Sequence, residues 1–133
     1  MAEYAVLTVD QGTDTIFQLE VVDSDRTAKD LTNLSVFAKY KSSYGQATGN
    51  SFQISVPTPK TNGIIELTVS GDSSISLYNA QRRYVYDIEL KNANDTVERI
   101  LEGILEINPG VTLSDSLQLE FLQFQAVKVV NIF

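Results

Sequence analysis

The stretch Tyr84-Val85-Tyr86-Asp87-Ile88-Glu89-Leu90 shows the clearest alternation in the chain. Large apolar or aromatic side chains stand at every second position, and two carboxylates stand among the residues between them. Because successive side chains of a strand point to opposite faces, this order predicts a strand with one buried and one wet face. We expect Tyr84 and Tyr86 to pack in a core, in preference to forming an exposed platform for a sugar ring.

The same alternation recurs on both sides of this stretch. Short alternating runs are separated by clusters of Gly, Asn, Asp, Ser and Pro, which is typical of antiparallel strands joined by turns. Within the run before Pro57 we expect Phe52, Ile54 and Val56 to point inward, and we expect Gly103 to mark a bulge or a close backbone approach. The predicted strands are residues 4–9, 15–22, 34–40, 52–56, 63–69, 84–90 and 96–107.

These strands predict the fold class. A chain of 133 residues fits one domain with one core. Short strands with turns at roughly 8- to 15-residue intervals, and no helices long enough for a βαβ plan, predict an all-β fold. We expect a single antiparallel β-sandwich of about seven to eight strands, immunoglobulin-like, over residues 1–112. The alternation fails between residues 70 and 81, where residues 74–80 are compatible with one helical turn over an end of the sandwich.

Residues 113–133 form an apolar C-terminal extension with only three charges. Both a helical stripe and a strand-like alternation fit it, and periodicity alone does not separate the two. We expect either an eighth strand that completes the sandwich or a docking arm that buries itself on a neighbouring subunit. The candidate partner-binding residues of such an arm are Leu113, Leu117, Leu119, Phe121, Phe124, Val127, Val129 and Phe133.

Composition argues against several function classes. Seventeen acidic residues against ten basic ones give a formal charge of −7, which repels a phosphate backbone, so we expect no nucleic-acid partner. No apolar run reaches the roughly 18 residues of a membrane helix, and the first residues do not look like a signal peptide, so we expect neither a membrane partner nor export by that route.

The chain lacks the residues of most catalytic sites. It has no histidine and no cysteine, so Ser-His-Asp, Cys-His and His-based zinc arrangements cannot form, and we expect no enzymatic activity and no cofactor. Asp23-Ser24-Asp25, with Asp30 downstream, is the one cluster that resembles a set of calcium ligands. It lacks the glycine and the distal Glu of an EF-hand loop, and a solvated turn is the better interpretation.

Several short segments, which describe strand and turn chemistry more than a site, are LTVDQGT (7–13), DLTN (30–33), GII (63–65), YVYDIEL (84–90), VERILEG (97–103) and NPGVT (108–112). Together they resemble the small β-sandwich structural proteins of tailed bacteriophages, including the N-terminal domain of baseplate upper proteins. The sequence departs from that family at Gln81-Arg82-Arg83, where members often carry a glycine.

The resemblance implies a virion structural protein without catalytic residues, assembled in the host cytoplasm. It implies assembly contacts at the tail, baseplate or fibre attachment, or alternatively a capsid decoration (cement) or neck protein. Its partners would be other virion proteins or copies of itself in a symmetric assembly. A different function class stays open, a carbohydrate- or receptor-binding module that contacts a glycan through the polar loop at 41–50, with Tyr44 and Gln46.

Overall fold

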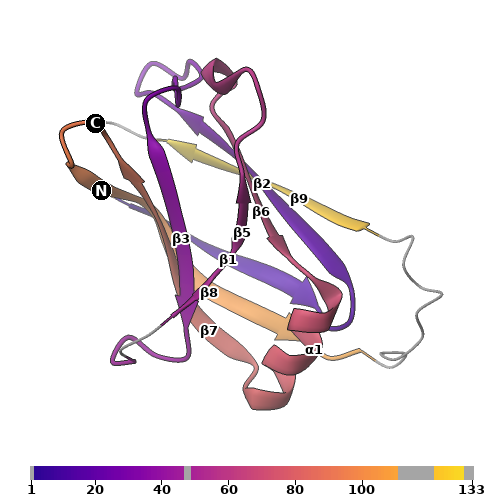
Figure 1. The fold of residues 1–133 in the computed structure, drawn as a ribbon. Coiled ribbons are helices and arrows are strands. Elements are labelled where there is room, and N and C mark those ends of the chain that lie inside the picture. Colours follow the sequence, from indigo (N-terminus) through magenta and orange to yellow (C-terminus); the bar gives the residue numbers. More distant parts are fainter. Residues whose placement is uncertain (1, 47–48, 111–121, 131–133) are drawn as a thin grey trace.

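The computed structural model describes residues 2–46, 49–110 and 122–130. These residues form an all-β fold of two sheets with one α-helix, as Figure 1 shows. Sheet A has the strand order β1-β8-β7-β3-β4, and sheet B has the order β5-β6-β2-β9. The elements are β1 (Glu3–Asp10), β2 (Asp14–Val22), β3 (Ser35–Lys41), β4 (Asn50–Ser51), β5 (Gln53–Ser55), the 3-10 turn η1 (Lys60–Asn62), β6 (Ile64–Val69), α1 (Gly71–Ala80), β7 (Arg83–Lys91), β8 (Val97–Asn108) and β9 (Leu122–Val130).

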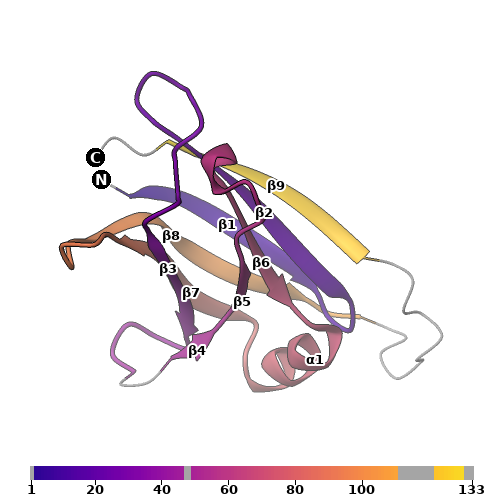
Figure 2. The ribbon, with the colours of Figure 1, turned by 45° about the horizontal axis from the view of Figure 1, so that its top comes forward.

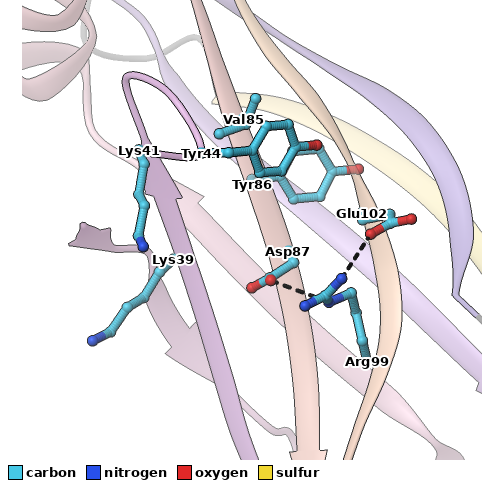
Figure 3. A pocket seen from close by; sticks show the side chains of 8 residues that line it. All are labelled: Lys39, Lys41, Tyr44, Val85, Tyr86, Asp87, Arg99 and Glu102. Carbon is cyan, nitrogen blue, oxygen red and sulfur yellow. Dashed lines mark hydrogen bonds and ion pairs between the residues drawn. The ribbon is translucent and has the colours of Figure 1, made fainter. Parts of the chain in front are cut away.

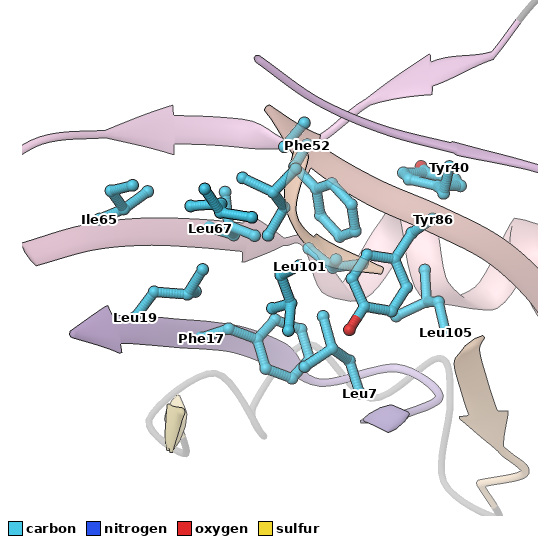
Figure 4. Close-up of a cluster of buried hydrophobic side chains, with 14 of the residues drawn as sticks. Leu7, Phe17, Leu19, Tyr40, Phe52, Ile65, Leu67, Tyr86, Leu101 and Leu105 are labelled. Atoms are coloured by element: carbon cyan, nitrogen blue, oxygen red, sulfur yellow. The ribbon is translucent and has the colours of Figure 1, made fainter. Parts of the chain in front are cut away.

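The core lies between the two sheets. Alternate residues of β2 and β6 from sheet B meet alternate residues of β7 and β8 from sheet A, as Figure 4 shows for part of the cluster. Phe17 and Leu19 are fully buried, and Tyr84 and Tyr86 are 5% and 3% exposed, so the expectation that both tyrosines belong to the core is confirmed. The alternation therefore predicted correctly which face of most strands is buried.

The expectation of a purely antiparallel arrangement is wrong. β1 pairs with β8 in parallel and β2 pairs with β9 in parallel, whereas the other described pairings are antiparallel. The partners in each parallel pair are far apart in sequence, so a long connection is present, as parallel pairing requires. Alternation reports which face of a strand is buried, but it carries no information on strand direction.

The predicted strand at 52–56 divides into two strands of different sheets. β4 pairs with β3 in sheet A, β5 pairs with β6 in sheet B, and the chain crosses between the sheets at Phe52, which is 4% exposed. The crossing interrupts the phase of the alternation. Ile54 is therefore 37% exposed rather than inward, while Val56 packs partly against the core. With β9 included, the described residues form nine strands instead of seven or eight.

Helix α1 is longer than the single turn expected at 74–80. Ser70 caps it by accepting a hydrogen bond from the Ser73 N–H at 3.2 Å, which satisfies one of the free donors of the first turn. Asp14 accepts a hydrogen bond from the Gly71 N–H at 2.6 Å, and the Gly12 N–H donates to the Ser74 hydroxyl at 2.8 Å. These contacts hold α1 against the turn between β1 and β2, at one end of the two sheets (Figure 2).

Candidate functional site

The sheet edges differ strongly in length. On one side of the molecule the sheets end in β4 and β5, which have two and three residues. On the other side they end in β1 and β9, which have eight and nine residues. In both ribbon views β1 begins and β9 ends at the end of the molecule away from α1 (Figures 1 and 2). A long unpaired edge presents backbone N–H and C=O groups to another strand, whereas a very short one does not.

Strand β1 is apolar on both faces. Leu7 and Val9 point into the core and are at most 1% exposed, whereas Tyr4 and Val6 on the outer face are 66% and 54% exposed. Within the described residues, β1 pairs with β8 and with no strand on its other side. It contains no Lys, Arg or Pro, the residues that commonly protect an edge strand from pairing. Among the residues that the structure describes, β1 is thus a long edge strand that lacks these residue types.

The position of β1 is held from within the core. The Tyr86 hydroxyl of β7 donates a hydrogen bond to the Ala5 carbonyl oxygen at 2.7 Å, reaching past β8. Burial, followed by the electrostatic influence of Tyr4 and Glu102, raises the pKa of the Tyr86 phenol, so the hydroxyl remains a donor at all ordinary pH values. This contact links the edge strand to the third strand of the sheet, one strand beyond its direct neighbour.

Gly103 lies between these two partners, in register with Ala5 on one side and Tyr86 on the other. Its φ is +156°, and a Cβ there would lie 2.0 Å from the Ala5 carbonyl oxygen. The expected close backbone approach is therefore confirmed. The register shift between β7 and β8 falls elsewhere, between Ile88 and Glu89, so the irregularity of this strand pair is not at Gly103.

The outer face of sheet A carries ion pairs across β7 and β8. Arg83 donates to Glu106 at 2.8 Å, and this hydrogen bond is the main cause of the lowered pKa of the Glu106 carboxyl. Arg99 contacts the Asp87 carboxylate at 3.2 Å and the Glu102 carboxylate at 3.1 Å. One guanidinium therefore pairs with two carboxylates in the middle of this face.

Beside these ion pairs lies a pocket of about 270 Å³, shown in Figure 3. β3 contributes Lys39 and Lys41, and the loop after β3 contributes Tyr44, whose side chain is 75% exposed. The remaining lining comes from β7 and β8 and includes Val85, Asp87, Arg99 and Glu102. Within the described part of the chain neither lysine forms an ion pair, so the pocket has two cations without a carboxylate partner.

Tyr44 and Gln46, the two loop residues predicted to contact a glycan, lie in different surroundings. Tyr44 does lie at a pocket, beside residues of three strands that are distant in sequence. Gln46 does not line it, because its side-chain oxygen accepts hydrogen bonds from the backbone N–H and the hydroxyl of Ser42, both at 2.7 Å. Gln46 therefore closes the loop.

The Asp23-Ser24-Asp25 segment and Asp30 form turns, as the better interpretation of the sequence held. Asp25 accepts hydrogen bonds from the N–H and hydroxyl of Thr27, at 3.1 and 2.6 Å, and these bonds lower the pKa of its carboxyl. Asp30 accepts the same pair of bonds from Thr32, again with a lowered pKa. Among the described residues, no three acidic side chains are grouped so as to hold a metal ion.

The predicted partner-binding residues of the C-terminal extension divide into two groups. Leu113, Leu117, Leu119, Phe121 and Phe133 lie outside the described residues. Phe124, Val127 and Val129 belong to β9, where they stand in register with Ile16, Leu19 and Val21 of β2. Residues 122–130 are thus part of sheet B, and a role of the extension in partner binding stays a prediction.

The exposed apolar face of β1 was missed by sequence reasoning, although a signal was present. In residues 4–9, apolar side chains occupy both phases of the alternation, with Tyr4 and Val6 on one and Ala5, Leu7 and Val9 on the other. A strand apolar on both faces is either covered on both or exposes one apolar face to a partner. The prediction for 4–9 was a strand alone, with neither face assigned to the core or to a partner.

Comparison with known proteins assigns no function to this chain, so a functional proposal has to rest on the fold and on these surfaces. No family model matches the chain, and no curated protein gives a significant match. In the part of the chain that the structure describes, the helix is too short and too polar to span a membrane.

Proposed function

We propose that this chain is a non-enzymatic structural protein of a tailed-bacteriophage particle, which joins neighbouring proteins at the tail, baseplate or fibre attachment. The observation that carries the proposal is that β1 is the last strand of sheet A among the described residues and exposes Tyr4 and Val6 on its outer face. An extended segment of a neighbouring protein would add to sheet A beside β1, with backbone hydrogen bonds providing affinity and the apolar side chains providing specificity. The resemblance to phage structural domains supports the same assignment.

The proposal includes an immunoglobulin-like arrangement of the two sheets. The order β5-β6-β2 agrees with strands D, E and B of that fold, and β8-β7-β3 agrees with strands G, F and C. Tyr84, at the start of β7, donates its hydroxyl hydrogen to the Leu77 carbonyl oxygen at 2.7 Å across the end of α1. This tie has the form of the tyrosine corner between strands E and F. Such domains serve widely as rigid modules between partners.

The exposed side chains indicate which kind of strand pairs with β1. Tyr4 and Val6 are 66% and 54% exposed on its outer face. A pairing segment with apolar side chains at alternate positions would contact both of them. In this proposal the segment belongs to a neighbouring protein of the particle.

The test compares two exposed valines of sheet A. Val6 is 54% exposed on the open edge, and Val97 is 51% exposed at the start of β8, beyond the residues that pair with β1. Val6→Lys places a charge in the proposed contact, whereas Val97→Lys makes the same change away from it. Both variants should fold, since neither side chain is in the core.

Each variant is supplied during particle assembly in place of the original chain, and its amount in purified particles is measured by quantitative mass spectrometry. We expect Val6→Lys to be lost from particles and Val97→Lys to be retained. Labelled chain located by electron microscopy distinguishes the tail and baseplate from a capsid decoration or neck position. Absence of the original chain from purified particles would overturn the proposal, and equal incorporation of both variants would overturn the role of β1.

A further inference from the structure

We propose that the pocket between β3, β7 and β8 binds one carboxylate-bearing sugar unit of an acidic glycan. This site lies on the outer face of sheet A and is separate from the β1 edge to which the assembly function is assigned. It does not depend on that function. Four features of the pocket lead to this class of ligand.

The first feature is the local charge. Lys39, Lys41 and Arg99 contribute three positive charges, and Asp87 and Glu102 contribute two negative ones, so the pocket has a net charge of +1 in a chain of net charge −7. A positive site on an acidic protein is not explained by solubility, which the overall charge already serves. It matches a single negative charge. The two carboxylates repel a doubly charged phosphate more strongly than a singly charged carboxylate.

The second feature is the location of the unpaired charge. Arg99 is occupied by Asp87 and Glu102, at 3.2 and 3.1 Å, which leaves Lys39 and Lys41 as the cations available to a ligand. In Figure 3 the two lysines lie on one side of the pocket, and Arg99 with its carboxylates lies on the other. A ligand between them would present its anionic group to the lysines.

The third feature is the aromatic side chain of Tyr44. It is 75% exposed and lies beside Val85 at the pocket. Because the ring is so exposed, packing in the core does not account for it. Sugar rings have a face of C–H groups that packs against an aromatic ring, and the tyrosine hydroxyl can still reach water or a ligand hydroxyl. An exposed ring next to free cations suits a sugar acid better than an inorganic anion, which has no apolar face.

The fourth feature is the set of hydrogen-bond acceptors opposite the lysines. Each carboxylate has two oxygens with several acceptor sites, and Arg99 uses only part of them. Asp87 and Glu102 can therefore accept hydrogen bonds from sugar hydroxyls while remaining paired with Arg99. The volume of about 270 Å³ is close to the lower end of typical small-ligand sites, which suits one sugar unit with the rest of the glycan outside.

The test is a titration of the full ¹⁵N-labelled chain, monitored by two-dimensional NMR. The probes are methyl β-D-glucuronide, methyl β-D-glucoside as its uncharged counterpart, and inorganic phosphate. We expect methyl β-D-glucuronide to give saturable shifts at the amides of Tyr44 and Val85. Its affinity should exceed that of the glucoside by about tenfold or more, a difference of about 1.4 kcal/mol.

Three variants separate the pocket from the rest of the surface. Tyr44→Ala and Lys41→Met should each weaken glucuronide binding by about fivefold or more, an effect of about 1 kcal/mol. Lys91→Met is the matched control, because Lys91 lies at the other end of β7 and pairs with Asp95 at 3.3 Å; it should bind as the original chain does. All three side chains lie outside the core, and amide dispersion in the same spectra reports folding.

Three results would overturn the proposal. One is the absence of saturable shifts at these amides with glucuronide up to its solubility limit. Another is equal binding of the glucoside, because the lysines would then have no role. The last is an equal response to phosphate at the same amides, which would make the pocket a general anion site. Each of these is read on the original chain and does not depend on a variant.

Discussion

Replacing Gly103 by alanine should detach the edge strand β1. Gly103 has a φ of +156°, which side chains rarely adopt, and its added Cβ would lie 2.0 Å from the Ala5 carbonyl oxygen and 2.9 Å from the Ala5 carbonyl carbon. Both contacts are to backbone, so no side-chain rotation relieves them. The chain has to move β1 away from β8 or change the backbone conformation at residue 103.

The magnitude follows from two contributions. Holding a non-glycine residue in an unfavourable backbone region costs about 1–3 kcal/mol. Moving β1 also breaks the hydrogen bond from the Tyr86 hydroxyl to Ala5, and leaving such part-buried groups unpaired costs about 1–3 kcal/mol. We therefore expect the free energy of unfolding to fall by about 2–6 kcal/mol. Domains of this kind are stable by only about 5–15 kcal/mol, so the loss should be easy to detect.

The assay is urea unfolding followed by far-ultraviolet circular dichroism and by tyrosine fluorescence, which the six tyrosines and the absence of tryptophan permit. Gly45→Ala is the matched control, because a Cβ at Gly45 meets no atom within 4 Å. It should change the free energy by no more than about 0.5 kcal/mol. Hydrogen exchange should show that the amides of β1 lose protection first in Gly103→Ala.

A result for Gly103→Ala that is indistinguishable from Gly45→Ala would refute this account of how β1 is held. Loss of protection spread evenly over both sheets, with β1 no more affected than β2 or β6, would refute the local mechanism while leaving the destabilisation itself in place. The two measurements therefore separate a local detachment from a general loss of stability.

Three further predictions concern other parts of the fold. Tyr86→Phe should cost about 1–3 kcal/mol in urea unfolding, because the part-buried Ala5 carbonyl loses its donor. Thr32→Val should raise the pKa of Asp30 toward its ordinary value in an NMR titration, because the Thr32 hydroxyl no longer donates to the carboxylate. In the original chain the lowered pKa stabilises the fold at pH values above the ordinary pKa of an Asp carboxyl, and this stabilisation is lost as the pH falls through the pKa of Asp30 in the folded state. Deleting residues 111–133 should lower the urea midpoint and expose β2 amides to exchange, since the ladder with β9 is removed; an unchanged midpoint would contradict this.

Local pattern was sufficient for most of the fold. Alternation in 15–22, 63–69 and 84–90 identified strands within a residue of their observed ends and placed the correct side chains in the core. It failed where the chain changes sheets. Ile54 stands two positions after the buried Phe52, but it belongs to a strand of the other sheet and is exposed. A crossing of this kind depends on pairing partners that lie far along the chain.

The candidate sites were predictable only in part. Tyr44 was named with Gln46 as part of the polar loop at 41–50, but most of the residues beside it come from β7 and β8, more than 40 positions later. No local pattern brings Lys41, Val85 and Glu102 together. Likewise, the apolar outer face of β1 was visible in residues 4–9, yet its exposure depends on β1 being the last strand of sheet A among the described residues.

The sequence by itself determined that this is an all-β chain with inward-facing core residues, without histidine or cysteine chemistry, and with a strong negative charge. These properties follow from composition and from a two-residue period that any strand must obey. Only the tertiary structure decided the strand directions, the position of β1 at the edge of sheet A among the described residues, and the pocket beside Tyr44. Each of these depends on which strands become neighbours, and that choice is made by the packing of the whole core and not by any segment alone.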